Sequence, residues 1–592
     1  MQDEQGWRPV PVGLDAARWT TFSDCRTVLV VVHTVTALTR LLDILPVLST
    51  DRRIQTVFTS PGTSTFHSGV DEFLRDMEAP TIPWAQATHT PFDLALTASL
   101  GGELHKISAP LIIIPHGVGY TKYSKYRSTE VQKYRSTEVQ KYRSTEVQKY
   151  RSTEVQKYRS TEVQKYVFGL GRDQLMHNGR VIPAALVLSH DEQREQLQRN
   201  CPEALPVAVV AGDPCYDRIV VSAGRRAEYR RALGVGVDMR LVLMTSTWGQ
   251  ESLLGRYPDL ASRLLAELPL DEYRVVAVLH PNIWHGHGPW QVRTWLAEAQ
   301  RAGLALVPPR EGWRAALVAS DIVIGDHGSV TFYGAALGRP IVLGAFGEED
   351  LDPSCPTAEL GRTAPRLDLR RSIREEIDDT LAGHAPGRYT ALTSRALAVP
   401  GESQTRLLEL MYRLMNMATP EDPPTAISVP PPEPETQKVT AVLTVTAVEA
   451  GETTVRLTRY PASLPAVRAA AHSPAHLVVD IDDADLRMRE SASVLIRQGA
   501  AGTEAETWTG AALDGYPAAH LAAAVQAPGR YVIRTRGGQV LRLSCTSDPT
   551  TDLALIASAV YGWQSVHRPL SALAEGLWIH AGATRLRVTS LP

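Results

Sequence analysis

The sequence predicts a multidomain α/β protein with two Rossmann-like domains, an inserted tandem repeat and a C-terminal α+β or mostly β domain. Near-continuous apolar runs alternate with helical patterns up to residue 416, which is typical of parallel sheets covered by helices on both faces. A proline-rich stretch follows, and beyond it apolar and polar residues alternate around hairpin turn signals. A length of 592 residues is too great for one hydrophobic core and supports several domains.

The composition excludes several classes of protein. Hydrophobic residues make up 44% of the chain and the formal net charge is -3, so nucleic acid is not expected as a partner. Five cysteines are scattered without a CxxC pair, which favours a reducing compartment and argues against a structural zinc site. The N-terminus lacks the apolar core of a signal peptide, and no run approaches the roughly 20 apolar residues of a transmembrane segment. The sequence therefore predicts a cytoplasmic protein.

Residues 1–222 are predicted to form the first Rossmann-like domain. Its strands are expected at the apolar runs 27–33, 54–58, 109–114, 184–188 and 206–210. The third run is followed by Pro115-His116-Gly117, which places a histidine at the carboxyl end of a strand. Ligands of parallel α/β sheets bind in the crevice beyond these ends, so His116 is a candidate site residue.

Residues 231–416 are predicted to form the second Rossmann-like domain. Its strands are expected at 241–248, 274–280, 304–308, 321–325 and 340–344. A polar turn and a helical segment rich in small residues lie between the last two strands. In this turn Gly328 would let a ligand approach the backbone, and Ser329 would offer a hydroxyl beside the free N–H groups of the helix. The alternative is an ordinary strand–helix turn with Ser329 as the helix N-cap.

The C-terminal part of the chain changes character. Residues 417–438 are rich in proline and acid and are predicted to be an extended linker. Residues 439–592 are expected to form an accessory domain with hairpins near Gly451 and at Gly537-Gly538. No motif in this domain indicates chemistry, so binding or interaction is its expected role.

A perfect tandem repeat, KYRSTEVQ, occupies 125–166 and occurs five times from Lys125 to Gln164. Its Lys, Arg, Glu and Gln residues favour a helix over a strand or disorder, and it lacks the residues that turn strands. A helix would carry a Tyr/Val stripe and span roughly 60 Å at 1.5 Å per residue. We expect the stripe to support self-association, with copy number tuning function; the alternatives are a solvated arm and an engineered insertion.

Five short motifs follow one another at the expected strand ends. They are Pro115-His116-Gly117; Gly212, Pro214 and Asp217; Thr247-Trp248; His280-Pro281; and Asp326, Ser329, Val330 and Phe332. Together they resemble the CDP-glycerol glycerophosphotransferase family, which includes the teichoic acid polymerases. The resemblance covers roughly 105–345, and it implies the glycosyltransferase-B architecture, in which two Rossmann-like domains face one another across a cleft. The chain departs from the family pattern at Pro115, Gly249, Gly328 and Tyr333, which affects the expected substrate more than the expected donor class.

The resemblance implies a transferase that moves a glycerophosphate or glycosyl group from a CDP- or UDP-linked nucleotide-diphospho donor to a hydroxyl acceptor. His116 would act as the base that removes the hydroxyl proton. His280, Ser329 and the amides near Gly328 would stabilise the phosphates of the leaving nucleotide.

Thr247 and Asp326 are expected to shape the same pocket, with all the site residues converging between the two domains. No cofactor or metal ion is expected, because no Asp-x-Asp signature is present. His285 and His287 are two potential metal ligands without a third, and we expect them in an exposed loop. Two other functions stay open: a nucleotide-sugar epimerase on the same fold, and a degenerate, non-catalytic sensor or scaffold that assembles through the repeat.

Overall fold

The computed structural model describes residues 6–13, 16, 20–22, 24–49, 51–123, 167–422, 426–449, 453–470, 474–499, 502–545 and 551–591. The chain divides into two compact units. Unit 1 comprises Met1–Arg218, Gly347–Thr363 and Tyr389–Ala426, and unit 2 comprises Ile219–Phe346, Ala364–Arg388 and Ile427–Pro592. The KYRSTEVQ repeat at 125–166 lies outside the described residues, so its predicted helix and its role in self-association stay predictions.

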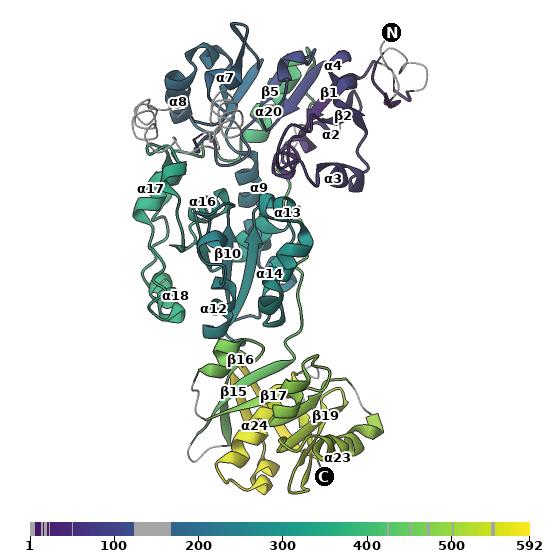
Figure 1. The fold of residues 1–592 in the computed structure, drawn as a ribbon, viewed down its shortest axis with the longest axis vertical. Coiled ribbons are helices and arrows are strands. Elements are labelled where there is room, and N and C mark those ends of the chain that lie inside the picture. Colours follow the sequence, from purple (N-terminus) through teal and green to yellow (C-terminus); the bar gives the residue numbers. More distant parts are fainter. Residues whose placement is uncertain are drawn as a thin grey trace, which may run out of the picture. The chain divides into compact units, whose positions relative to one another are not determined.

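Unit 1 is built on a seven-stranded parallel sheet with the order β3-β2-β1-β4-β5-β8-β9 (Figure 1). The strands are β1 (Arg26–Val31), β2 (Ile54–Ser60), β3 (Thr81–Pro83), β4 (Leu94–Thr97), β5 (Leu111–Ile113), β8 (Ala185–Leu188) and β9 (Ala208–Val210). This is a Rossmann strand order, so the predicted fold class is confirmed for this sheet. The strands β3 and β4 were not predicted, because runs of three and four residues carry little pattern.

The first strand explains why the apolar runs are continuous. Val28 and Val30 of β1 belong to one hydrophobic core, while Leu29 and Val31 belong to another. Successive side chains of a strand point to opposite faces, so a sheet covered on both faces needs apolar residues at every position. The helices of this unit are α1 (Val35–Leu41), α2 (Pro46–Ser49), α3 (Val70–Asp76), α4 (Trp84–His89), α7 (Arg172–Leu175), α8 (Glu192–Asn200), α9 (Pro214–Ser222), α17 (Pro356–Thr363), α19 (Thr390–Thr393) and α20 (Ser403–Leu414).

Helix α20 follows the second sheet in sequence but packs in unit 1. Asp217 of α9 accepts hydrogen bonds from the Gly401 N–H at 2.7 Å, the Ser403 N–H at 3.1 Å and the Ser403 hydroxyl. It thereby satisfies amides at the start of α20 that have no partner within the helix. Gly212 has a φ of +80°, and a Cβ there would lie 2.7 Å from the Ala398 oxygen. The Gly-x-Pro-x-x-Asp motif therefore has a structural role, which is to fix the start of α20.

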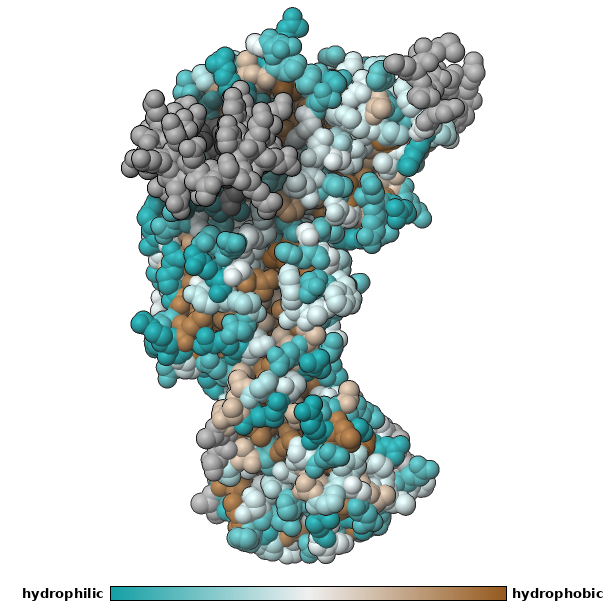
Figure 2. Space-filling model, viewed as in Figure 1, coloured by the Kyte–Doolittle hydropathy of each residue, from teal (hydrophilic) through white to brown (hydrophobic). Residues whose placement is uncertain are grey.

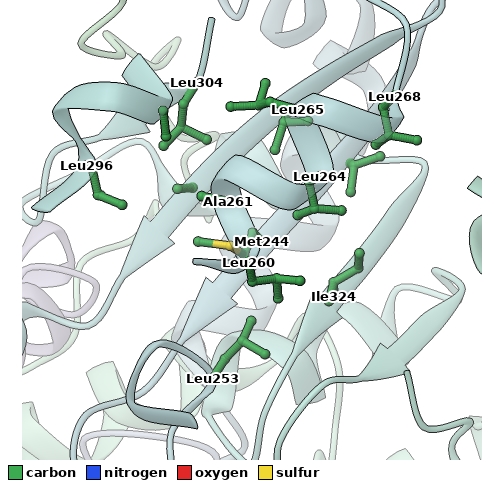
Figure 3. Packing of buried hydrophobic residues seen from close by; sticks show 14 of the residues in the cluster. Met244, Leu253, Leu260, Ala261, Leu264, Leu265, Leu268, Leu296, Leu304 and Ile324 are labelled. Carbon is green, nitrogen blue, oxygen red and sulfur yellow. The ribbon is translucent and has the colours of Figure 1, made fainter. Parts of the chain in front are cut away.

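Unit 2 begins with a five-stranded parallel sheet in the order β12-β11-β10-β13-β14, which is again a Rossmann order. Its strands are β10 (Arg240–Ser246), β11 (Tyr273–Leu279), β12 (Ala305–Val307), β13 (Ile322–Gly325) and β14 (Ile341–Leu343), which confirms all five predicted runs. Its helices are α10 (Arg226–Ala232), α11 (Leu253–Arg256), α12 (Leu260–Glu267), α13 (Pro281–His287), α14 (Pro289–Arg301), α15 (Trp313–Ala319), α16 (Ser329–Ala336) and α18 (Ile373–Ala382). In Figure 3 the apolar side of α12, with Leu260 and Ala261, lies near Met244 of β10.

The rest of unit 2 is a closed barrel with the order β15-β16-β22-β23-β21-β20-β19-β18-β17. Its strands are β15 (Ala441–Val448), β16 (Thr454–Pro461), β17 (Ala475–Asp480), β18 (Val494–Arg497), β19 (Leu521–Ala527), β20 (Arg530–Thr535), β21 (Val540–Cys545), β22 (Leu577–Ala581) and β23 (Thr584–Ser590). The two predicted hairpins are confirmed as the antiparallel pairs β15–β16 and β20–β21. The turn of the second hairpin uses Gly538 with a φ of +85°.

Helix α24 (Leu553–Ser565) occupies the interior of this barrel. Its side chains share one core with the inward-facing residues of strands from all around the barrel. Buried residues occur on every side of the helix, as expected of a helix surrounded by protein. The helices α21 (Pro465–Ala469), α22 (Leu486–Ser491) and α23 (Ala505–Gly515) lie outside, and α23 packs on β19 and β20. The barrel is therefore filled by its own helix.

The barrel is joined firmly to the amino-terminal edge of the second sheet. The Arg459 guanidinium of β16 makes two hydrogen bonds to Asp271, at 2.9 and 2.6 Å, and also pairs with Asp552. The predicted linker runs along the edge strand β12, where Leu306 and Glu435 exchange both backbone hydrogen bonds. The Arg293 guanidinium donates two hydrogen bonds to the Glu435 carboxylate, at 2.8 and 2.7 Å. This part of the linker is thus bound along the edge of the sheet.

On the face drawn in Figure 2, hydrophobic residues form scattered patches among hydrophilic ones, as on most protein surfaces. None of the described helices combines the length and the apolar character that a membrane span requires.

Candidate active site

The carboxyl end of the second sheet gathers the polar groups that follow β10, β11 and β13. Asp326, which is 1% exposed, follows β13. Its Oδ2 accepts the N–H groups of Thr247 and Leu253, both at 2.8 Å, and its Oδ1 accepts that of Gly328 at 2.9 Å. The carboxylate therefore ties the loop after β10 to the turn after β13. Thr247 and Asp326, predicted to shape one pocket, lie together at this edge.

The turn after β13 leads directly into α16. Gly328 occupies the N-cap position, with a φ of -77° and no side-chain cap, and Ser329 is the first helical residue. The alternative that Ser329 caps the helix is therefore wrong, because the chain enters the helix one residue earlier. A Cβ at Gly328 would lie 3.1 Å from Asp326 Oδ1 and 3.4 Å from Thr247 Cβ. A glycine keeps this turn tight, and no side chain of the N-cap residue itself lies over the start of α16.

His280 follows β11 and caps α13. Its Nδ1 accepts the Asn282 N–H at 3.1 Å, and its own backbone N–H donates to the Ser246 oxygen at 2.9 Å. An imidazole whose Nδ1 accepts a hydrogen bond carries its proton on Nε2. The geometry thus assigns a donor to the far side of the ring. It also links the end of β11 to the end of β10, so His280 belongs to the same edge as Thr247.

His116 lies in unit 1, three residues beyond β5. Its ring contacts Phe168 edge to face, with 6.0 Å between the centroids. Desolvation by the surrounding protein is the largest cause that lowers the pKa of His116, to about 4, and the positive charges of Arg40 and Lys122 come next. The side chain is exposed to solvent, which weakens the effect of desolvation, whereas the two charges still act on the ring and lower its pKa. His116 is therefore neutral at pH 7 and can accept a proton.

Sequence reasoning missed His33, which follows β1 in the middle of the same sheet. It is 1% exposed, and its Nε2 lies 2.5 Å from the Gly101 oxygen. The signal that singled out His116, a histidine directly after an apolar strand, is equally present in TVLVVVH at 27–33. His327 was also missed; it is 4% exposed and its ring contacts Phe346 edge to face at 5.9 Å.

His285 and His287 were expected in an exposed loop, and this prediction is wrong in part. Both lie in α13, because Pro281 begins a helix that His280 caps. His287 is exposed and packs its ring against Trp295 at 4.9 Å, whereas His285 is only partly exposed. Within the described part of the chain, no three His, Cys, Asp or Glu side chains cluster as metal ligands would.

His116 belongs to unit 1, whereas Thr247, His280, Asp326, Gly328 and Ser329 belong to unit 2. The structure brings the residues of unit 2 together at one sheet edge. Their convergence with His116 on a shared pocket stays a prediction.

Comparison with known proteins finds solved structures of limited similarity. No family model matches the chain, and no curated protein matches it either. Similar solved structures include the wall teichoic acid polymerase TagF, with 11% identity and a TM-score of 0.43 over 66% of this chain and 89% of TagF. They also include S. aureus MnaA with UDP, at 12% identity and a TM-score of 0.37 over 68% of this chain and all of MnaA. A UDP-GlcNAc 2-epimerase from Methanocaldococcus jannaschii has 10% identity and a TM-score of 0.37, over 65% of this chain and 99% of the epimerase. At such identities and TM-scores, neither the CDP-glycerol family nor a substrate is assigned to this chain.

Proposed function

We propose that this protein is a transferase that takes a glycerophosphate or glycosyl group from a CDP- or UDP-linked nucleotide-diphospho donor and passes it to a hydroxyl acceptor. In this proposal unit 2 holds the donor phosphates and unit 1 supplies the base.

The observation that carries the proposal is the cluster at the carboxyl end of the second sheet. Three strand ends meet there. Three amide hydrogen bonds to Asp326 join the loop after β10 to the turn after β13, and the hydrogen bond from the His280 N–H to the Ser246 oxygen joins the end of β11 to that of β10. Ser329 starts α16 behind a glycine, and His280 is oriented with Nε2 as a donor. Helix N–H groups, a hydroxyl and an imidazole N–H are the donors that suit a diphosphate, and the positive end of the helix dipole adds to them.

His116 supports the second half of the proposal. A neutral imidazole can take the proton of an acceptor hydroxyl as the oxygen attacks the donor. The new bond forms between that oxygen and the transferred phosphorus or sugar carbon, and the bond to the nucleotide phosphate breaks with its electron pair. The proton ends on His116, and the charge that grows on the leaving nucleotide is stabilised by His280 and by Ser329 at the start of α16.

The epimerase alternative is less favoured. An epimerase needs an acidic residue that is free to act on a sugar carbon, whereas the Asp326 carboxylate is fully engaged by backbone amides. A role as a non-catalytic sensor or scaffold is the main rival, and the following experiment separates it.

The test is calorimetry and turnover with CDP-glycerol, UDP-glucose and UDP-GlcNAc. Ser329→Ala and His280→Ala should each weaken donor binding by about 1–3 kcal/mol, the range for a hydrogen bond to a charged group. His116→Ala should abolish turnover and leave binding unchanged. His287→Ala, at the other end of α13, is the matched control for His280→Ala and should bind normally.

If His116→Ala abolished binding as well, its assignment as the base would be wrong. Binding without turnover in the wild type would support the scaffold. If none of the three donors bound, the transferase proposal would be wrong.

A further inference from the structure

The candidate phosphate site has no positively charged side chain among the residues that form it. Its loop, cap and turn at 247–252, 280–282 and 326–329 contain no Lys or Arg. They carry the carboxylates of Glu251 and Asp326 instead, and Asp326 is buried at the centre of the edge. A diphosphate is an anion, so these carboxylates would repel it. A cation from a neighbouring element would offset that repulsion.

Three arginines of unit 2 come into question as this cation. Arg256 is already paired with Glu251 of the same loop. Arg310 follows β12, which lies three strands from β13 in this sheet, a spacing of about 14 Å. Arg366 lies beside β14, the immediate neighbour of β13. The strand order therefore favours Arg366.

A short segment after α17 extends the sheet beyond β14 and carries this arginine. The Leu343 N–H donates to the Pro365 oxygen at 2.8 Å, and the Leu367 N–H donates to the Leu343 oxygen at 3.0 Å. Arg366 is therefore level with Leu343, which is paired in turn with Gly325, the last residue of β13. The backbone of Arg366 thus lies two strand spacings, or about 10 Å, from the turn that follows β13.

Two ring contacts connect the Arg366 side chain to that turn. Its guanidinium carbon lies over the Phe346 ring, 5.0 Å from the ring centroid. The Phe346 ring contacts the His327 ring edge to face, with 5.9 Å between the centroids. His327 belongs to the turn itself and is buried, so it gives Phe346 a fixed support. Arg366 is exposed, and its guanidinium is thereby held beside the turn on a side that a ligand can approach.

We propose that Arg366 binds the donor diphosphate together with Ser329 at the start of α16. A guanidinium presents a planar fork of N–H donors that matches phosphate oxygens, and stacking on an aromatic ring orients this fork in advance. The start of α16 holds one phosphate and Arg366 holds the other, so the arginine selects diphosphates over monophosphates. That the ligand is a nucleotide donor rests on the proposed function, whereas diphosphate binding can be measured without it.

The experiment compares four variants of the full chain. Arg366→Gln removes the charge and keeps a polar side chain, and Arg366→Lys keeps the charge without the planar fork. Phe346→Leu removes the aromatic support. Arg370→Gln is the matched control, because Arg370 is an exposed arginine of the same segment that pairs with Asp368 at 2.8 Å. Thermal melts establish that each variant is folded, and Arg366→Lys carries the test if Arg366→Gln is not.

The first readout is calorimetry with UDP and CDP against UMP and CMP. Arg366→Gln should weaken the binding of both diphosphates by about 10–100-fold, the loss expected for hydrogen bonds to a charged group, and that of the monophosphates by less than about threefold. Arg366→Lys should fall between Arg366→Gln and the wild type, Phe346→Leu should lose about 2–5-fold, and Arg370→Gln should bind normally. Unchanged diphosphate affinity in folded Arg366→Gln, or an equal loss for the monophosphates, would overturn the proposal.

Inorganic pyrophosphate is the second probe, and it needs neither a nucleotide nor turnover. Wild type and Arg370→Gln should bind it, and Arg366→Gln should lose about tenfold or more. If no donor bound while pyrophosphate binding depended on Arg366, the transferase proposal would fail and the role of Arg366 would stand. If Arg366→Gln bound and turned over donors normally, the transferase function would stand and the role of Arg366 would be refuted. A wild type that bound neither pyrophosphate nor any nucleotide would refute both.

Discussion

Asp326 is the residue whose replacement best tests how the candidate phosphate site is built. Its carboxylate accepts three backbone N–H groups at 2.8, 2.8 and 2.9 Å, and the side chain is buried. A hydrogen bond to a charged group contributes about 1.5–3 kcal/mol, so three would total about 4–9 kcal/mol. The turn can relax and admit water in Asp326→Ala, so we expect the lower end, about 4 kcal/mol.

Asp326→Asn should cost less. Its amide oxygen can still accept from Thr247 and Leu253, whereas its NH₂ group would face the Gly328 N–H, so one acceptor is lost. The expected cost is about 2 kcal/mol. Asp514→Asn, an exposed aspartate of α23, is the control and should be neutral.

The assay is hydrogen exchange of peptides covering 247–253 and 326–330, because a chain with several domains has no single free energy of unfolding. At 1.4 kcal/mol per tenfold change, exchange should rise roughly 1000-fold in Asp326→Ala and roughly 30-fold in Asp326→Asn. If exchange in Asp326→Ala stayed within threefold of the wild type, Asp326 would not hold the edge together.

Three further substitutions test other parts of the fold. His476 of β17 is buried, its Nε2 has no hydrogen-bond partner among the described residues, and burial lowers its pKa to about 4. The unfolded chain therefore binds more protons between pH 6.5 and 4, so the barrel should lose stability as the pH falls through this window. His476→Leu should stabilise by about 1–3 kcal/mol and remove part of that dependence, measured by thermal melts from pH 4 to 8; equal pH dependence would count against this account. Arg459→Ala leaves Asp271 unpaired beneath the barrel and should destabilise this region by about 3–5 kcal/mol, measured by hydrogen exchange of the peptides that cover Asp271 and β16, whereas a loss below 1 kcal/mol would contradict a structural role. Gly212→Ala forces a side chain into a left-handed conformation against a carbonyl and should cost about 1–3 kcal/mol by hydrogen exchange of the peptides that cover Gly212 and the start of α20, a neutral effect being the contrary result.

The strands of both parallel sheets were largely determined by local sequence. A strand buried on both faces must be apolar at each position, and β1 shows this directly, with Val28 and Leu29 in opposite cores. The hairpin at Gly537-Gly538 could also be predicted from the local sequence, because a tight turn needs a residue that tolerates positive φ. Strands such as β4 were missed because their pairing partners, and not their own pattern, define them.

The barrel and the site were decided by tertiary structure. The segment that forms α24 is apolar on all sides, and nothing local indicates that nine strands close around it. Asp326 and Asp217 are both aspartates of short motifs after expected strands. Asp326 joins two strand ends by hydrogen bonds, whereas Asp217 binds the start of a helix that is distant in sequence. His33 and His116 each follow an apolar run, but only the pairing of β1, β4 and β5 sets the ends of their strands level in one sheet. Residue type and strand position are local properties, whereas the partner of each hydrogen bond depends on how the whole chain is folded.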